Sequence, residues 1–441
     1  MNKSRRRFLQ QSTALAAASF SGISAATKSF ANASANDRPR LGCIGTGDRG
    51  MWDSREHARF ADVVAVSDVD SSHAERARID ENIGRGKAKA YSDYRKVLDD
   101  PNIDVVSIVT PDHWHSKIAI EALQAGKHVY CQKPLTLTLE ENQLIRRAAK
   151  RYSDSIFFVG TQQRSDPRTF LRAVNMVRQG LLGEIRKVTI GIDGAPTGGP
   201  FPVKDPPKEL DWERWLGQAP LVDYRAKRCH YDFRWWYEYS GGKFTDWGAH
   251  HVDIATWAVG MDGENQGPIE VDGSDAHHPV ELVDGSPTAH DSYNTSHDFL
   301  VKCHFDTGLE FEVTSRARNG ILFEGSRGRL FVNREKITGV PVEEDWDAGK
   351  YGSEELRTLY KGKPHEGHME NFYRTLREGG QPVSDVFSHL QMMNTCHLCA
   401  IAARVGRSIT WDPREERITG DDIAAGLAAR QPRKGYEIPQ V

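Results

Sequence analysis

The chain has 441 residues, which is enough for two ordinary domains with complete hydrophobic cores rather than one. Its 58 Lys and Arg residues nearly balance its 61 Asp and Glu residues, so the sequence lacks the basic excess typical of nucleic-acid-binding proteins. The six cysteines are scattered and do not form the closely spaced framework of a small disulfide-rich protein.

The first 35 residues have the three parts of a twin-arginine signal peptide. Arginines occupy positions 5–7, a mildly apolar run covers 14–26, and small residues at 33–35 form a cleavage site. Such leaders serve proteins that cross the membrane already folded, so we expect export by the twin-arginine machinery to the periplasm. The leader carries five basic residues and no acidic one, and its removal lowers the net charge from −3 to −8. No other stretch approaches the roughly 18 apolar residues of a membrane span, so neither a membrane nor nucleic acid is an expected partner of the mature chain.

A dinucleotide-binding fingerprint follows the first apolar segment, residues 40–44. Residues 45–50 read GTGDRG, the glycine spacing of a strand-to-helix turn whose backbone can approach a pyrophosphate. Asp68 lies 21 positions beyond Gly47, the spacing of a carboxylate that binds the ribose 2′-hydroxyl. Because its charge would repel a 2′-phosphate, NAD is expected rather than NADP. The candidate cofactor-binding residues here are Gly45, Gly47, Asp48, Arg49, Gly50 and Asp68.

The leader and the fingerprint together constrain the chemistry. A periplasm is not expected to supply fresh nicotinamide nucleotide, so the cofactor should be loaded in the cytoplasm and carried outward inside the folded protein. The reaction should then regenerate its cofactor at each turnover, or be redox-neutral overall.

Residues 36–161 alternate short Val- and Ile-rich segments with helical patterns, which is typical of the α/β Rossmann fold. The expected strands are 41–44, 63–67, 87–91, 105–110, 128–131 and 156–160. Beyond residue 161 the pattern changes to helices mixed with hairpins, as in 301–313 and 321–332. We expect residues 162–441 to form an α+β domain with a large, mostly antiparallel open sheet, whose C-terminal helices can pack back on the first domain.

Four motifs in chain order carry a resemblance to a known family. Besides residues 45–50, they are TPDHWH at 110–115, CQKP at 131–134 and GGKFTDWGAHHVD at 241–253. On these residues the whole mature chain resembles the Gfo/Idh/MocA superfamily, which includes glucose–fructose oxidoreductase and inositol dehydrogenase. The resemblance implies a second domain that binds a sugar or polyol against the Rossmann domain, and frequently a homo-oligomer formed through the large sheet. It also implies further residues beside the cofactor, namely Thr110, Pro111, His115, Gln132 and Lys133.

The same resemblance implies a catalytic role for Lys133, which would assist proton movement at the hydroxyl that is oxidised. Gln132 stands where a glutamate is common in the family, and this removes one source of support for the ammonium. Pro134 permits a cis peptide bond that would aim the amine. His250 is the implied acid/base, and Asp246 is the implied orienting group for substrate or histidine. The two are four positions apart, so they share a face if one helix carries both.

Five further residues are expected to contact the substrate. Gln162 and Arg164 follow the sixth expected strand. Tyr231, Trp235 and Tyr237 either stack on sugar rings or belong to the core. The histidines show no zinc-protease spacing, so no metal is expected.

Three functions from different classes remain open. The first is a periplasmic oxidoreductase that holds NAD tightly, oxidises one carbohydrate hydroxyl and hands the hydride to a second sugar. The second is an NAD-dependent glycosidase that works by transient oxidation, elimination, water addition and re-reduction, with Tyr231 or Tyr237 as the extra base. The third is a non-catalytic sugar- or nucleotide-binding protein. Loop 193–210 and the acidic residues 343–345 are expected to shape the choice of substrate.

Overall fold

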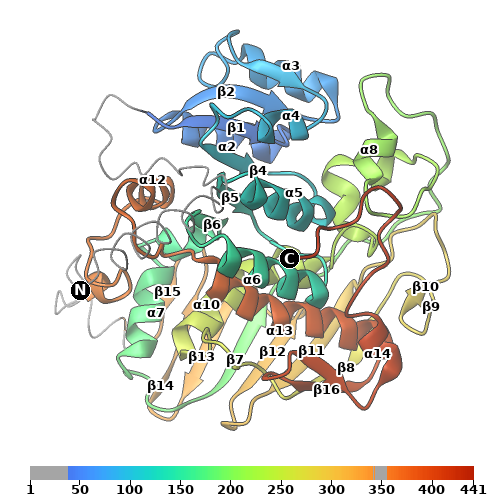
Figure 1. Cartoon of the computed structure of the whole chain (residues 1–441). Coiled ribbons are helices and arrows are strands. Elements are labelled where there is room, and N and C mark those ends of the chain that lie inside the picture. The colour runs from blue at the N-terminus through green and yellow to red at the C-terminus, as the bar shows by residue number, and fades with distance from the viewer. Residues whose placement is uncertain (1–37, 341, 343–354) are drawn as a thin grey trace, which may run out of the picture.

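The computed structural model describes residues 38–340, 342 and 355–441, so the expected leader (1–35) and the acidic residues 343–345 lie outside the described residues. The described chain begins with a parallel sheet of order β3-β2-β1-β4-β5-β6, in blue and teal in Figure 1. Its strands are β1 (Arg40–Ile44), β2 (Asp62–Ser67), β3 (Lys89–Tyr91), β4 (Val105–Ile108), β5 (His128–Gln132) and β6 (Phe157–Gly160). All six expected strands are present, each end within two residues of its expected position. The predicted Rossmann fold is confirmed.

Helices cover both faces of this sheet because its central strands, β4 and β5, are buried along their whole length. These helices are α2 (Asp48–Ala58), α3 (Ser71–Ile79), α4 (Arg95–Leu98), α5 (Asp112–Gln124) and α6 (Leu139–Arg151). A separate hydrophobic core forms on each face. The strand order reverses between β1 and β4, and doubly wound sheets bind ligands beside the carboxyl ends of strands at such a point.

The second domain is built on a sheet of order β15-β14-β13-β7-β12-β11-β8-β16-β17. The strands are β7 (Ile185–Gly191), β8 (Glu270–His277), β11 (Asp298–His304), β12 (Glu310–Thr314), β13 (Gly320–Gly325), β14 (Gly328–Val332), β15 (Ile337–Thr338), β16 (Ser408–Asp412) and β17 (Arg417–Thr419). Only β7 and β12 pair in parallel within this described sheet. The predicted large and mostly antiparallel sheet is therefore confirmed. The short strands β9 (Leu282–Val283) and β10 (Ser286–Pro287) pair apart from it.

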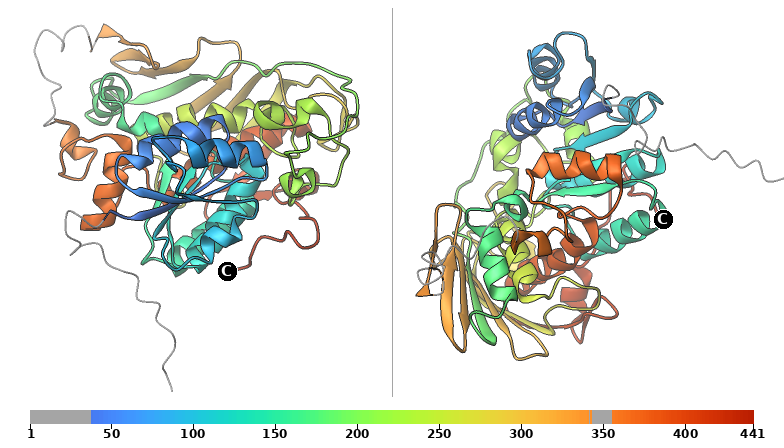
Figure 2. Two further views of the ribbon diagram at one scale, coloured as in Figure 1. Left: turned by 90° about the horizontal axis from the view of Figure 1, so that it is seen from above. Right: turned by 90° about the vertical axis from the view of Figure 1, so that its left-hand side faces the viewer.

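Three helices lie between the large sheet and the first domain, as Figures 1 and 2 show: α7 (Phe170–Arg178), α10 (Gly248–Val259) and α13 (Val386–Val405). With the inward-facing side chains of the strands they form the largest core. Helix α13 also packs against α6. Helix α12 (His368–Glu378) packs on the first domain through Phe372 and Tyr373. These contacts join the two domains firmly and so fix the shape of the space between them.

The segment between β7 and α10 contains short helical turns and an aromatic cluster. Its elements are α8 (Trp212–Leu216), η3 (Ala226–Arg228), η4 (His230–Trp235) and α9 (Lys243–Asp246). The remaining short elements are η2 (Gln162–Ser165), η5 (Glu355–Thr358) and α14 (Asp422–Gly426). All six cysteines are buried free thiols, including Cys396 and Cys399 on α13. No helix in the described part of the chain has the length and hydropathy needed to cross a membrane.

Candidate active site

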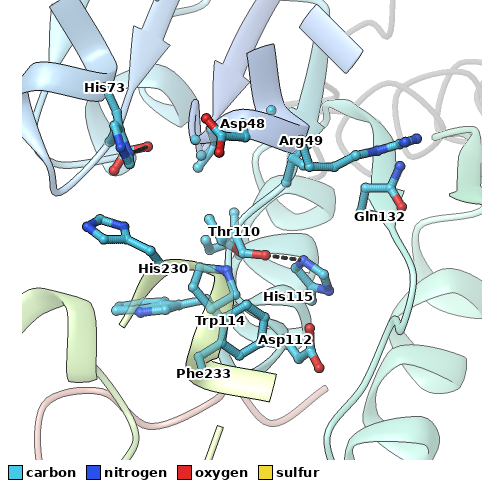
Figure 3. A pocket seen from close by; sticks show the side chains of 18 of the residues that line it. Asp48, Arg49, His73, Thr110, Asp112, Trp114, His115, Gln132, His230 and Phe233 are labelled. Atoms are coloured by element: carbon cyan, nitrogen blue, oxygen red, sulfur yellow. Dashed lines mark hydrogen bonds and ion pairs between the residues drawn. The ribbon is translucent and has the colours of Figure 1, made fainter. Parts of the chain in front are cut away.

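A cavity of about 1260 Å³ lies between the two domains, at the carboxyl ends of the first sheet. The first domain contributes the turns after β1, β2, β4 and β5, and the second contributes η4, α9 and the start of α10. Figure 3 shows His73 and His230 on one side of the cavity, and Arg49 and Gln132 on the other. The volume exceeds that of most small-ligand pockets and is sufficient for a dinucleotide together with a sugar.

The glycine turn after β1 fits a pyrophosphate. Gly45 has a φ of +82°, and a Cβ there would lie 2.6 Å from the Val109 backbone. A Cβ on Gly50 would lie 2.0 Å from the Gly45 carbonyl oxygen. Gly47 lines the cavity, and a Cβ on it would meet nothing nearer than His73 Nδ1 at 3.7 Å. The first and last glycines thus shape the turn, whereas Gly47 leaves room for a ligand at the N-terminus of α2, where no side chain caps the free N–H groups.

Gly47→Ala is expected to impair NAD binding, whereas Gly50→Ala is expected to impair the stability of the protein. In Gly50→Ala the turn must move, which should lower the free energy of unfolding by about 1–3 kcal/mol or more. Gly47→Ala should change it by only about 0.5 kcal/mol. The methyl group of Gly47→Ala should nevertheless weaken NAD binding about tenfold or more, because it occupies the room that the pyrophosphate needs. Chemical denaturation and calorimetric titration with NAD separate the two effects, and unchanged NAD affinity in Gly47→Ala would contradict this assignment.

Asp68 directly follows β2 and lines the same end of the cavity. Its Oδ2 accepts a hydrogen bond from Thr46 N at 2.7 Å, and its Oδ1 accepts one from Asp70 N at 2.9 Å. This orientation suits the contact with the ribose, which stays a prediction. Asp48 lies nearby at the start of α2 with a fully exposed side chain, paired with Arg76 at 3.3 Å.

The turns after β4 and β5 form the middle of the cavity wall. Thr110 and Pro111 line the cavity, and so does His115 on the first turn of α5. The two ring nitrogens of His115 lie 2.7 Å from the carbonyl oxygen of Pro134 and 2.8 Å from that of Thr110. Burial lowers the pKa of His115 to about 4, so the neutral ring donates to one of these oxygens and only contacts the other. The Lys133–Pro134 peptide bond is cis, as the sequence permits.

Gln132, which replaces the family's usual glutamate, has a buried acidic partner. Its Nε2 donates to Asp53 Oδ2 at 2.7 Å, and its Oε1 accepts from Lys133 N at 3.1 Å. Burial raises the pKa of Asp53 to about 6, although Arg49 and Gln132 act in the opposite direction. Arg49 binds Asp53 at 2.9 Å and stacks on Trp52. Gln132 is therefore held in place beside Lys133.

The Lys133 amine meets Asp246 from the second domain. Its Nζ lies 2.8 Å from Asp246 Oδ1 and 2.9 Å from the Asp246 carbonyl oxygen, and both side chains are mostly buried. Burial alone would raise the pKa of Asp246, but Lys133 and Arg234 outweigh it and bring the pKa to about 2. Asp246 holds Lys133 and has no bond to His250 among the described residues; its other expected role, orienting the substrate, stays a prediction.

His250 lies on the same wall but not on the same helix as Asp246. Asp246 ends α9, and His250 belongs to the first turn of α10, which begins at Gly248. The expected single helix is thus interrupted at Trp247. The Nδ1 atom of His250 has no hydrogen-bond partner among the described residues. Burial, followed by the positive charge of Lys133, holds the pKa of His250 well below its usual range, so the imidazole is neutral and can accept a proton.

This lowered pKa predicts the acid limb of the pH profile. A histidine that must be neutral is inactivated as the pH falls through its own pKa, so kcat/KM should stay constant down to below about pH 6.5 and decline only at lower pH. The substitution His250→Gln should lower the pH-independent value of kcat/KM and abolish its decline at low pH. The exposed His304, which lies 3.5 Å from Glu310 and does not line the cavity, provides the control His304→Gln. An acid limb at or above pH 6.5 that depends on His250 would contradict the assignment.

Asp112 is a site residue that the sequence reasoning missed. It is buried, lines the cavity, and its Oδ2 has no hydrogen-bond partner among the described residues. Burial raises its pKa to about 7, although Arg234 and Lys133 act in the opposite direction. Its position just after β4, inside the motif at 110–115, could have identified it.

Arg334 was also missed, and no sequence signal links it to Gln163 or to the rest of the site. The Gln163 amide, turned so that both its atoms are satisfied, donates to the His250 carbonyl oxygen at 2.9 Å and accepts from Arg334 Nε at 3.2 Å. Both residues line the cavity. Arg334 follows β14, far along the chain, so only the fold brings it to His250.

Two of the five expected substrate residues reach the cavity. Gln162 lines it and donates to Tyr130 Oη at 3.0 Å. Tyr231 lies at its rim with 67% of its surface exposed. Trp235 is instead buried in the aromatic cluster. The Oη atom of Tyr237 lies 2.9 Å from His278 Nε2, and neither of these two residues lines the cavity. Of the two alternatives left open by the sequence, Trp235 and Tyr237 follow the second and pack inside the protein, because the alternating aromatic residues divide between cavity and interior.

Arg164 was wrong as a substrate residue. It is 2% exposed and forms a bidentate pair with Asp253, with both N–O distances 2.7 Å. Its remaining Nη1 donates to Ser388 Oγ and to the Val383 carbonyl oxygen. The guanidinium of Arg164 thus donates its hydrogen bonds to groups of the protein rather than to a ligand. Loop 193–210 contributes only its last residue, Leu210, to the cavity lining, which corrects the expectation for that loop.

Two family models match the chain. The model described as "Oxidoreductase family, NAD-binding Rossmann fold" matches residues 12–161, and that described as "Oxidoreductase family, C-terminal alpha/beta domain" matches 175–334. Both are models of the Gfo/Idh/MocA family, and together they span most of the chain.

Among curated proteins, the chain is similar to a myo-inositol 2-dehydrogenase of Thermotoga maritima, at 26% identity over 78% of this chain and 90% of the relative. It is 28% identical to a levoglucosan dehydrogenase of Pseudarthrobacter phenanthrenivorans over 64% of this chain and 67% of the relative. It is 34% identical to an alpha-N-acetylgalactosaminidase of Shewanella oneidensis over only 33% of each chain.

Among solved structures, the WlbA dehydrogenase of Bordetella pertussis in complex with NADH and UDP-GlcNAcA has the same fold, with a TM-score of 0.59 at 20% identity over 85% of this chain and 99% of that one. The fold, the glycine turn and both family models agree. The chain belongs to the Gfo/Idh/MocA oxidoreductase family and has that family's NAD-binding Rossmann domain.

Proposed function

We propose that this protein oxidises one hydroxyl of a sugar, polyol or sugar derivative, with NAD held tightly and regenerated in the same site by a second sugar. The observation that carries this proposal is the wall formed by Lys133, Asp246 and His250, which faces the cavity beside the glycine turn. Bound NAD would supply the hydride acceptor. The relatives named as dehydrogenases of inositol and levoglucosan support a polyhydroxylated substrate.

The protein's own groups supply the proton chemistry. The Lys133 ammonium, held by Asp246, donates a hydrogen bond to the hydroxyl oxygen and favours its deprotonation. His250, which is neutral and lines the cavity, accepts the hydroxyl proton. When the second sugar is reduced, the same two groups return the proton.

The leader expected at 1–35 supports the closed cycle and a periplasmic location. A protein that is exported folded carries its nucleotide with it, so the site must release sugars while it retains NAD. We also propose that copies of the chain associate through the large sheet, which light scattering of the mature protein tests.

The nucleotide content of the purified mature protein tests the closed cycle first. After thorough desalting and denaturation, we expect close to one equivalent of NAD plus NADH per chain by chromatography. Mixed pairs of aldoses and ketoses should then react without added nucleotide. An empty site that binds added NAD weakly would overturn the closed cycle and leave an ordinary dehydrogenase.

One observation favours a second function, an NAD-dependent glycosidase. Elimination and water addition need an acid/base beyond Lys133 and His250, and Asp112, whose pKa is about 7, lies in the same cavity. Tyr231 and Tyr237, the bases expected from the sequence, are less suited, since one lies at the rim and the other lies outside the cavity. Release of a free aglycone from aryl glycosides, without net NADH, would select this function. Asp112→Asn should then abolish aglycone release but retain hydroxyl oxidation.

A further inference from the structure

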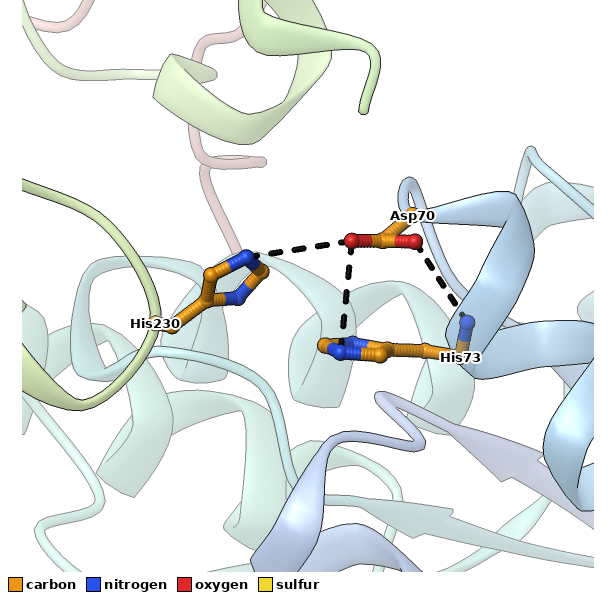
Figure 4. Close-up of side chains that lie close together, drawn as sticks. All are labelled: Asp70, His73 and His230. Carbon is orange, nitrogen blue, oxygen red and sulfur yellow. Dashed lines mark hydrogen bonds and ion pairs between the residues drawn. The ribbon is translucent and has the colours of Figure 1, made fainter. Parts of the chain in front are cut away.

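Three metal-ligating side chains converge at the end of the cavity that holds Asp68. They are Asp70, His73 and His230, and one ligand atom from each lies within 4.8 Å of the other two (Figure 4). Asp70 and His73 belong to the start of α3 in the first domain, whereas His230 begins η4 in the second. The spacing of these residues along the chain gave no sign of a metal site, because the fold alone brings His230 to the other two.

The three side chains face one another without a side-chain hydrogen bond between them, although the backbone N–H of His73 donates to Asp70 Oδ1 at 3.4 Å. His73 Nε2 lies 3.9 Å from Asp70 Oδ2, and His230 Nε2 lies 3.8 Å from the same oxygen. The two imidazole ring centroids are 5.0 Å apart. Ligands about 2.0–2.1 Å from a tetrahedral zinc ion lie roughly 3.4 Å from each other. To bind one ion, the two carboxylate–imidazole distances would have to shorten by about half an ångström, and the two histidine nitrogens, which lie within 4.8 Å of each other, by up to about 1.4 Å.

The surrounding bonds orient each group toward the centre of the cluster. Asp70 Oδ1 is used by the N–H and the hydroxyl of Ser72, at 2.9 and 2.5 Å, which leaves Oδ2 free. His73 Nδ1 faces Asp68 Oδ2 at 3.7 Å, so its Nε2 points to Asp70. A carboxylate behind a ligating histidine is the usual arrangement at metal sites.

The imidazole of His230 is presented from a turn at the start of η4. Its backbone φ is +50°, a left-handed conformation that a non-glycine residue adopts at some cost. The side chain is 46% exposed, and that of His73 is 23% exposed, so an ion can reach both.

We propose that Asp70, His73 and His230 bind one divalent cation of the zinc class, with solvent or substrate-side ligands in the remaining positions. Two imidazoles and one carboxylate favour Zn²⁺, Co²⁺ or Ni²⁺ over Mg²⁺ and Ca²⁺, which prefer oxygen ligands. Because the ligands come from both domains, the ion would clip η4 to α3 across the end of the cavity occupied by Asp68. This clip would slow the escape of the nucleotide, a consequence that rests on the proposed function.

Metal binding is measured on the full mature protein, purified without a polyhistidine tag and stripped with a chelator. We expect one Zn²⁺ per chain by calorimetry, at a dissociation constant of micromolar or below, and no comparable binding of Mg²⁺. His73→Ala and His230→Ala should each weaken binding at least tenfold, whereas the control His304→Ala, which removes a histidine that lies 3.5 Å from Glu310 and does not line the cavity, should not. Absence of stoichiometric binding, or equal binding in His230→Ala, would overturn the proposal.

A second measurement does not depend on the folding of any variant. Co²⁺ added to the wild-type protein should give intense visible absorption bands typical of nitrogen and oxygen ligation at low coordination number, and Zn²⁺ should displace them. A spectrum identical to that of hexaaqua Co²⁺ would overturn the site.

The clip is tested by nucleotide release. A chelator should accelerate the release of NAD from the wild type at least tenfold, and should have no such effect on His230→Ala. Equal rates of NAD release with and without metal would refute the clip. The calorimetric titration would still show whether the metal site exists. Because metal binding and nucleotide release are read without turnover, failure of the proposed sugar oxidation is detected separately.

Discussion

Lys133→Met is expected to lower kcat for sugar oxidation by about 10³-fold while the protein stays folded and binds NAD. The methionine keeps the length of the side chain but removes the ammonium that lies 2.8 Å from Asp246 and would polarise the hydroxyl. Asp246 keeps a second cationic neighbour, Arg234, at 3.6 Å, so loss of the lysine does not leave an isolated buried charge. Single-turnover kinetics with the resident cofactor measure the oxidation step directly.

The matched control for this substitution is Lys150→Met. Lys150 forms an exposed pair with Glu264 on the surface, and its replacement should leave kcat unchanged. His250→Gln should resemble Lys133→Met in kcat. If Lys133→Met alters only stability, the chain is a binding protein rather than an enzyme; if it abolishes NAD binding with normal oxidation in the residual complex, Lys133 serves the cofactor alone.

Asp253→Asn is expected to lower the free energy of unfolding by about 3–5 kcal/mol, although neither Asp253 nor its partner lines the cavity. The substitution leaves the guanidinium of Arg164, which is 2% exposed, without its bidentate carboxylate. A buried charge without a partner is costly, because the protein interior solvates it poorly. The combined replacement of Arg164 by Met and Asp253 by Leu removes both charges and should cost less than Asp253→Asn alone.

Chemical denaturation measures this effect, and Glu264→Gln is its control. The Lys150–Glu264 pair is more than half exposed on both sides, and its loss should change the unfolding free energy by at most about 1 kcal/mol. The KM for the sugar should be the same in folded Asp253→Asn and wild type. A raised KM with unchanged stability would restore Arg164 to the substrate site in which the sequence placed it.

Most of the fold was predictable because its signals are local. Short apolar segments separated by helical patterns predicted all six strands of the first sheet, and the hairpin patterns predicted the mostly antiparallel second sheet. The glycine turn was equally readable, since Gly45 and Gly50 are required by contacts within their own turn. The motifs at 131–134 and 241–253 pointed to Lys133 and His250, and the structure places both residues in the lining of the cavity.

The sequence by itself determined the two-domain α/β and α+β architecture and the nucleotide turn, because each depends on residues that are neighbours along the chain. Only the tertiary structure decided how distant side chains pair. It placed Asp246 on Lys133 rather than on His250, and it buried Arg164 against Asp253. It also brought His230 to Asp70. The physical reason is that a charged or polar side chain must satisfy its bonds with whatever packs against it, and packing between separate segments leaves no local periodicity in the sequence.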